Sequence, residues 1–184
     1  NCQPYLSTLL LRERFYSTST DILNIGAVDY TLTSEQIKEL RTIVTSFEAE
    51  EQGDIQHYID LVQMRELYDY MREKFANEVD NSYTSYTRED MKEAVFSVLY
   101  SNNCHMPPTK RVFKELFPGV YRVFATIKRK RYEDLSIMLM RMESKLVLDR
   151  ICHRIASEYP EAVIFTIHDS IVTTVSYESV VTEV

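Results

Sequence analysis

Most of the chain alternates apolar and polar residues with the period of an α-helix. In one stretch Ile37, Leu40 and Val44 recur at steps of three and four residues, which predicts a helix with one apolar face. Thr33 precedes this helix and Gln36 follows three residues later, which is the pattern of a capping box. The same reasoning predicts helices over 4–14, 34–51, 55–76, 88–101, 109–117, 119–130 and 132–158.

Two of these helices begin at recognisable capping residues. Gly53 interrupts the helical pattern, and Asp54 is predicted to cap the helix that follows it. Thr87 precedes the helix over 88–101, and Asp90 stands at its third position. Because the chain has only 3 glycines and 5 prolines, we expect long elements with few interruptions.

The last part of the chain changes period. Residues 162–167 (AVIFTI) and 171–175 (IVTTV) are short runs rich in β-branched residues, separated by His168-Asp169-Ser170. Two such runs with three residues between them predict a tight β-hairpin. The predicted fold class is therefore α+β, predominantly helical, with an antiparallel hairpin that carries His-Asp.

Composition narrows the class of protein. The 184 residues are 45% hydrophobic and 27% charged, which is typical of a folded chain rather than a disordered one. An odd count of 3 cysteines without a CxxC pair argues against a disulfide scaffold or a structural zinc site and predicts a reduced, cytoplasmic protein. No apolar run has the length of a membrane span. The chain begins at Asn1 rather than Met, which indicates a fragment of a longer protein.

The net charge of -7 conceals a segregation of charge along the chain. Residues 21–62 carry nine acids and two bases, whereas residues 108–131 carry eight bases and one acid. Bases interleaved with aromatic residues suit a nucleic-acid backbone, although a solvated basic helix face would have the same composition. The candidate nucleic-acid-binding residues are Lys110, Arg111, Lys114, Arg122, Lys128, Arg129, Lys130 and Arg131.

Four residues of the helix over 88–101 stand four positions apart. They are Arg88, Lys92, Phe96 and Tyr100. A step of four turns the helix by about 400°, so the four side chains lie along one stripe. The cations lie towards the helix N-terminus, where anions bind favourably, and the aromatic residues follow. This arrangement suits a nucleoside triphosphate; a surface helix with solvated cations and buried aromatic residues is the alternative.

The predicted hairpin carries a second candidate site. An aspartate at the end of a tight turn, Asp169, suits a carboxylate that coordinates Mg²⁺, a cation that prefers oxygen ligands. Asp and Ser are also common in turns for local hydrogen-bonding reasons, so an ordinary turn is the alternative.

Together these features resemble the single-subunit right-hand polymerases, which comprise the family A DNA polymerases and the phage-type RNA polymerases. The stretch R-EDM-K-EAV-F-SVL-Y from Arg88 matches motif B of the family, and VIFTIHDSIVTT resembles motif C. The order of the motifs agrees, as does the long helix with Met142-Glu143-Ser144 between the basic segment and the hairpin. The start NCQPYLSTLLLRE resembles the end of motif A.

The resemblance implies a fold, an activity and a role for each matched residue. Residues 1–32 would belong to the palm, 33–131 to the helical fingers, and 132–184 to the palm with the motif C hairpin. The implied activity is two-metal transfer of a nucleotide from a dNTP to the 3′-hydroxyl of a DNA primer-template, with Mg²⁺ as cofactor.

Asp169 would bind the metals and His168 would sit beside the primer terminus. Arg88 and Lys92 would hold the triphosphate, with Lys92 assisting the leaving pyrophosphate; Phe96 would line the sugar pocket and Tyr100 would sit near the template base.

Three departures from the family pattern matter. If Gln3 aligns with the motif A glutamine, the first metal-binding aspartate falls just before residue 1, so the chain should be inactive by itself. DNA polymerases commonly have glutamate at the position of Ser170, whereas phage-type RNA polymerases have serine there. Phe96, in contrast, favours the DNA branch. Ser101 replaces the usual glycine. A phage-type RNA polymerase fragment and a non-enzymatic helical nucleic-acid-binding module are the alternatives.

Overall fold

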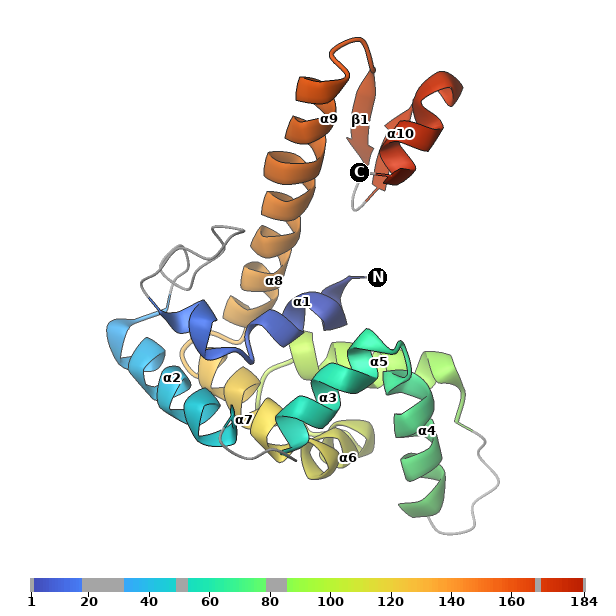
Figure 1. Cartoon of the computed structure of the whole chain (residues 1–184). Coiled ribbons are helices and arrows are strands. Elements are labelled where there is room, and N and C mark those ends of the chain that lie inside the picture. Colours follow the sequence, from blue (N-terminus) through green and yellow to red (C-terminus); the bar gives the residue numbers. More distant parts are fainter. Residues whose placement is uncertain (1, 18–31, 49–52, 79–85, 168–169, 184) are drawn as a thin grey trace. The chain divides into compact units, whose positions relative to one another are not determined.

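The computed structural model describes residues 2–17, 32–48, 53–78, 86–167 and 170–183. These residues are mostly helical and include one two-stranded antiparallel sheet, which confirms the α+β, predominantly helical part of the predicted fold class (Figure 1). The chain forms two compact units, Asn1–Leu139 and Met140–Val184. The division falls within the helix over Asp134–Ser144, whereas the predicted boundaries follow residues 32 and 131. Within the described ranges, no helix has the length and apolar character needed to cross a membrane.

The first unit packs its helices around an aromatic cluster. Tyr58 is fully buried, and its ring meets the rings of Phe113, Phe117 and Phe124 edge-on at centroid distances of 5.9, 5.3 and 6.4 Å. The Tyr58 hydroxyl lies 3.0 Å from the hydroxyl of Ser7, and burial raises the pKa of the phenol. The elements are α1 (Gln3–Leu9), the 3₁₀ helix η1 (Glu13–Tyr16), α2 (Ser34–Glu48), α3 (Asp54–Gln63), α4 (Leu67–Glu78), α5 (Arg88–Tyr100), α6 (Pro108–Leu116), α7 (Pro118–Ile127) and the start of α8 (Asp134–Ser144).

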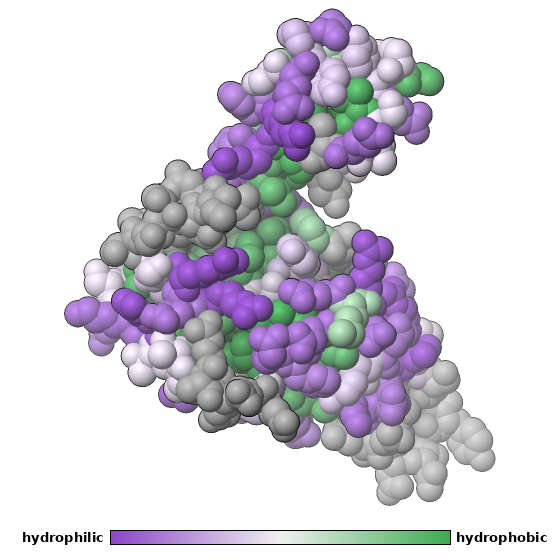
Figure 2. All heavy atoms as spheres, in the orientation of Figure 1, coloured by the Kyte–Doolittle hydropathy of each residue, from purple (hydrophilic) through white to green (hydrophobic). Residues whose placement is uncertain are grey.

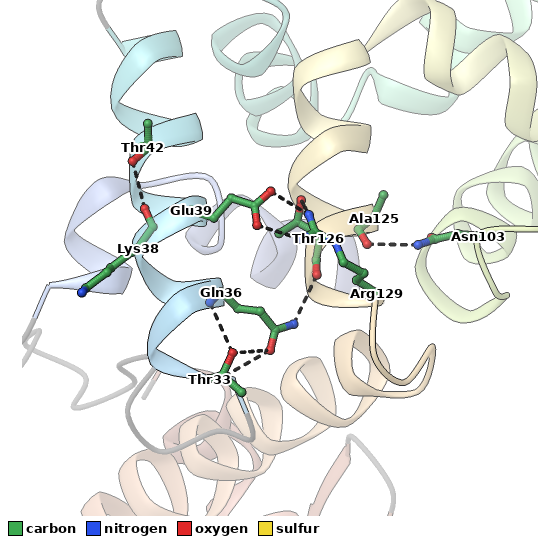
Figure 3. A network of polar contacts seen from close by, with 9 residues as sticks. All are labelled: Thr33, Gln36, Lys38, Glu39, Thr42, Asn103, Ala125, Thr126 and Arg129. Atoms are coloured by element: carbon green, nitrogen blue, oxygen red, sulfur yellow. Dashed lines mark hydrogen bonds and ion pairs between the residues drawn. The ribbon is translucent and has the colours of Figure 1, made fainter.

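Helix α2 begins at the predicted capping box. The backbone N–H of Gln36 donates to Thr33 Oγ1 at 3.3 Å, and the backbone N–H of Thr33 donates to Gln36 Oε1 at 3.1 Å (Figure 3). Gln36 Nε2 also donates to the carbonyl of Thr126 on α7 at 3.3 Å. The cap therefore also joins α2 to the helix beside it. Hydrophilic residues cover much of the visible face of this unit, and patches of apolar residues show among them (Figure 2).

The single helix predicted over 55–76 is wrong, because the chain turns between α3 and α4. The Glu66 N–H donates to Leu61 O at 2.8 Å and the Arg65 N–H to Val62 O at 3.2 Å. These two bonds form a Schellman motif, which requires a left-handed residue at C′, just after the end of the helix. That residue is Arg65, with φ of 62°. Because this position holds arginine rather than glycine, the sequence gives no signal of the break, and the helical pattern of apolar residues continues across it.

Asp54 caps a different helix from the predicted one. Gly53 is the N-cap of α3, and Asp54 is its first helical residue. The Asp54 carboxylate accepts hydrogen bonds from the backbone N–H groups of Gly119 (2.7 Å) and Val120 (3.2 Å), at the start of α7. The N-cap residue of α7 is Phe117, whose side chain has no acceptor, so a carboxylate from α3 accepts hydrogen bonds from the free N–H groups there.

The second unit begins with helical structure and ends with the hairpin. From α8 the chain continues through a π-helical segment, η3 (Lys145–Cys152), into α9 (His153–Glu158), in agreement with the long helix predicted over 132–158. Strands β1 (Ile164–Ile167) and β2 (Ser170–Thr173) pair antiparallel, with Ile164 opposite Thr173 and Ile167 opposite Ser170. The hairpin prediction is confirmed, but Ser170 belongs to β2 rather than to the turn. A 3₁₀ turn, η4 (Val175–Tyr177), and α10 (Glu178–Glu183) follow.

Candidate functional site

Helix α5 carries the row of four candidate residues and starts at the predicted capping box. The Asp90 N–H donates to Thr87 Oγ1 at 3.2 Å, and the Thr87 N–H donates to Asp90 Oδ2 at 2.6 Å. Hydrogen bonds from Thr87 lower the pKa of the Asp90 carboxyl. The opposite face of the helix is buried in the core through Met91, Ala94, Val95, Val98 and Leu99. The row is therefore fixed in direction by both the cap and the core.

The two cations of the row are exposed enough to meet a ligand. Arg88 is half-exposed, lies 3.5 Å from Asp69 as an ion pair, and stands over the ring of Tyr68 at 5.1 Å. Lys92 Nζ donates to Glu89 Oε1 at 2.9 Å. Both ion pairs are at the surface, where such pairs contribute little and are readily exchanged for a stronger anion.

The two aromatic residues of the row lie beside each other further along α5. The ring centroids of Phe96 and Tyr100 are 5.7 Å apart with the planes tilted by 49°, and both side chains are half-buried. The row is thus divided in the structure as expected, with exposed or half-buried cations in its first half and two neighbouring, half-buried aromatic rings in its second half.

A cleft of about 630 Å³ opens beside the cationic half of the row. Arg88 and Lys92 line it, whereas Phe96 and Tyr100 are not among its lining residues. Arg65, Arg88 and Lys92 are three cations in its wall, and no Asp or Glu is among the lining residues that the structure describes. Arg88 and Lys92 are each paired with a carboxylate that is not among these lining residues, Asp69 and Glu89 respectively. Its remaining lining residues are Cys2, Pro4, Tyr5, Val62, Gln63, Leu67 and Tyr68.

Two of the eight predicted nucleic-acid-binding residues lie in the interior. The expectation that Lys110 and Lys128 are exposed is wrong, since their relative exposures are 0% and 3%. Lys128 Nζ donates to the carbonyls of Val98 (2.6 Å) and Ser101 (3.0 Å), and Lys110 Nζ donates to Asn102 O at 2.7 Å. Both ammonium groups therefore bind carbonyls in the last turn of α5 and just after it, and they are not available to a phosphate.

Burial changes the protonation of this lysine pair. Burial lowers the pKa of Lys128 from 10.5 to about 7, with a further contribution from the neighbouring Lys110 charge. Burial also lowers the pKa of Lys110. The pair stabilises the end of the helix that bears the candidate site, but it does so with ammonium groups that are costly to keep charged.

The other six bases of the segment are exposed. Lys114, Arg122 and Arg129 line a second cleft of about 480 Å³. The guanidinium of Arg129 donates two hydrogen bonds to the Glu39 carboxylate on α2, at 2.7 and 2.8 Å (Figure 3). This bidentate ion pair lowers the pKa of the Glu39 carboxyl. Arg131 forms an ion pair with Asp134 at 3.4 Å. The exposed bases are Arg111, Lys114, Arg122, Arg129, Lys130 and Arg131.

The residues predicted to bind metal fall at the hairpin. His168 and Asp169 connect β1 to β2 and lie outside the described residues, so their metal-binding and primer-side roles stay predictions. In the part of the chain that the structure describes, no group of three or more His, Cys, Asp or Glu side chains is placed to hold a metal ion.

Sequence reasoning missed part of the wall of the first cleft. Arg65, Tyr68 and Tyr5 belong to it, and none stands at a spacing that relates it to Arg88. Only the fold of α1, α3 and α4 brings them there. No protein-family model, curated protein or solved structure matches this chain.

Proposed function

We propose that this chain is the fingers-and-palm part of a template-directed nucleotidyltransferase, of the DNA polymerase type, which adds a nucleotide from a dNTP to the 3′-hydroxyl of a DNA primer. The observation that carries the proposal is the cleft beside α5, whose described wall residues include Arg88 and Lys92 and no Asp or Glu. The motif B spacing of Arg88 and Lys92 is a property of the sequence and is independent of the cleft that they line.

The chemistry asked of these residues is electrostatic. Phosphoryl transfer needs charge neutralisation on the phosphates and alignment of the attacking and leaving oxygens. Arg88 would hold the phosphates through its planar guanidinium group, and Lys92 would place an ammonium beside the leaving pyrophosphate. Phe96 and Tyr100 would face the sugar and the template base. Asp169 has the carboxylate that Mg²⁺ prefers, and Mg²⁺ would supply charge stabilisation at the reacting phosphate.

Primer extension by the longer protein that this proposal requires is the decisive experiment. We expect Asp169→Ala to abolish dNTP incorporation and Lys92→Ala to reduce it by at least about 10²-fold, because each removes charge that acts on the transferred phosphate. Lys38→Ala is the matched control, since Lys38 is exposed on α2 and does not line the cleft. Full activity of the Asp169 variant would refute the metal assignment, and full activity of the Lys92 variant would refute the proposed site.

Two alternatives rest on particular observations. Ser170, the first residue of β2, follows His-Asp as in the phage-type RNA polymerases, so the same extension assay should be run with ribonucleotides. The six exposed bases on and after α6 suit a module that binds nucleic acid without catalysis. Such a module would bind DNA with an affinity that falls steeply with salt, and it would incorporate no nucleotide of either kind.

A further inference from the structure

We propose that Arg65 is a third phosphate ligand of the cleft, acting with Arg88 and Lys92 on a linear oligophosphate. The proposal rests on the proposed function because it adds a binding residue to the same site. It starts from the composition of the wall, where three cations from two different parts of the chain meet and where no Asp or Glu stands among the described lining residues. Arg65 comes from the junction of α3 and α4, and Arg88 and Lys92 come from the first turns of α5.

The backbone at Arg65 is unusual for an arginine. Its φ of 62° places it in the left-handed region, at the position of the Schellman motif that glycine ordinarily fills. A residue with a Cβ atom is disfavoured in this conformation. The helix junction would therefore be more stable with glycine. Strain of this kind is concentrated at functional sites, and here the strained residue is one of those that line the cleft.

The charge of Arg65 is also less compensated than that of its neighbours. Arg88 is paired with Asp69, and Lys92 is paired with Glu89. Across the described ranges, the Arg65 guanidinium forms no ion pair or side-chain hydrogen bond. A cation without a carboxylate partner attracts an external anion without first having to release an internal one. Three cations in one cleft match the several negative charges of a triphosphate chain better than two do.

The probe for this proposal is inorganic tripolyphosphate, titrated into the chain by calorimetry in the presence of a chelator and at low salt. Without divalent metal, binding reports the cations alone and does not depend on Asp169. We expect Arg65→Gly to weaken binding by about tenfold, the value of one charge-assisted hydrogen bond. We expect the same variant to raise the Tm by roughly 2–4 °C, because glycine relieves the left-handed strain.

Two further variants separate the charge from the backbone. Arg65→Lys keeps the charge and the strained conformation, so its affinity should stay within about threefold of the parent and its Tm should not rise. Lys38→Gln removes the same charge from an exposed site on α2 and should alter neither quantity. The expected signature is thus a variant that is more stable and binds less tightly, which a purely structural arginine would not produce.

Two results would overturn the proposal. One is Arg65→Gly binding tripolyphosphate as tightly as the parent chain, and the other is a parent chain that does not bind it at all. These failures are distinct from failure of the proposed function, which is decided by nucleotide incorporation in the longer protein. A chain that binds tripolyphosphate through Arg65 but supports no incorporation would keep the phosphate site and refute the polymerase.

Discussion

The buried ammonium of Lys128 should make the stability of the first unit rise with pH just above neutrality. Burial lowers the pKa of Lys128 from 10.5 to about 7 in the folded chain, and Lys110 contributes in the same direction. Between these two values the unfolded chain binds more protons than the folded chain does. Raising the pH therefore favours the folded state, with a gain that begins near pH 7 and is complete near 10.5.

The size of the effect follows from the two pKa values. Between pH 7 and pH 9, the linkage relation gives an increase of about 2 kcal/mol in the free energy of unfolding. This is an upper bound, because the carbonyls of Val98 and Ser101 accept hydrogen bonds from the ammonium and favour its charged form. For a chain of this length, such an increase raises the Tm by about 4–8 °C.

Thermal unfolding followed by circular dichroism at several pH values from 7 to 9 measures this slope. Lys128→Met keeps most of the side-chain volume but cannot titrate, so its Tm should change much less over the same interval. Burial raises the pKa values of the Tyr16 and Tyr58 phenols. These phenols therefore lower the stability of the folded chain only as the pH passes about 10, which is above the range used. Equal slopes for the parent and the Lys128→Met variant would refute the reasoning.

Two smaller perturbations test contacts that hold the site and the second cleft. Thr87→Ala removes the hydroxyl that accepts from the Asp90 N–H, and we expect a loss of about 1 kcal/mol in urea unfolding, with Thr87→Ser retaining most of the stability; an unchanged midpoint would show that the cap does not contribute. Glu39→Gln removes the carboxylate paired with Arg129 at the surface, so we expect a loss of at most about 1 kcal/mol that disappears in high salt; a loss that persists at high salt would contradict this account of the pair.

Local sequence patterns sufficed where the stabilising contacts are local. The capping boxes at Thr33 and Thr87 were predictable because each joins residues three positions apart. The hairpin was predictable because its two strands are neighbours in the chain and share a β-rich composition. The row on α5 was predictable in direction, since helical geometry alone sets which side chains share a face.

Contacts between distant residues account for what the sequence did not reveal. Lys110 and Lys128 have the composition of a solvated basic face, but their partners are carbonyls at and after the end of α5, up to 30 positions away. The break at Arg65 carries no glycine, so the apolar pattern runs through it unchanged. The wall of the cleft combines α1, the α3–α4 junction and α5, and no spacing along the chain relates these elements.

The cap that Asp54 provides to α7 also bears on the order in which the first unit folds. Asp54 and Gly119 are 65 positions apart, so their bond requires α3 and α7 to be docked already. The closure of such a long loop costs entropy before the contact is made. We expect the bond to form after the folding transition state, where an interaction slows unfolding without accelerating folding. The bond then mainly lengthens the lifetime of the folded unit and has little effect on its folding rate.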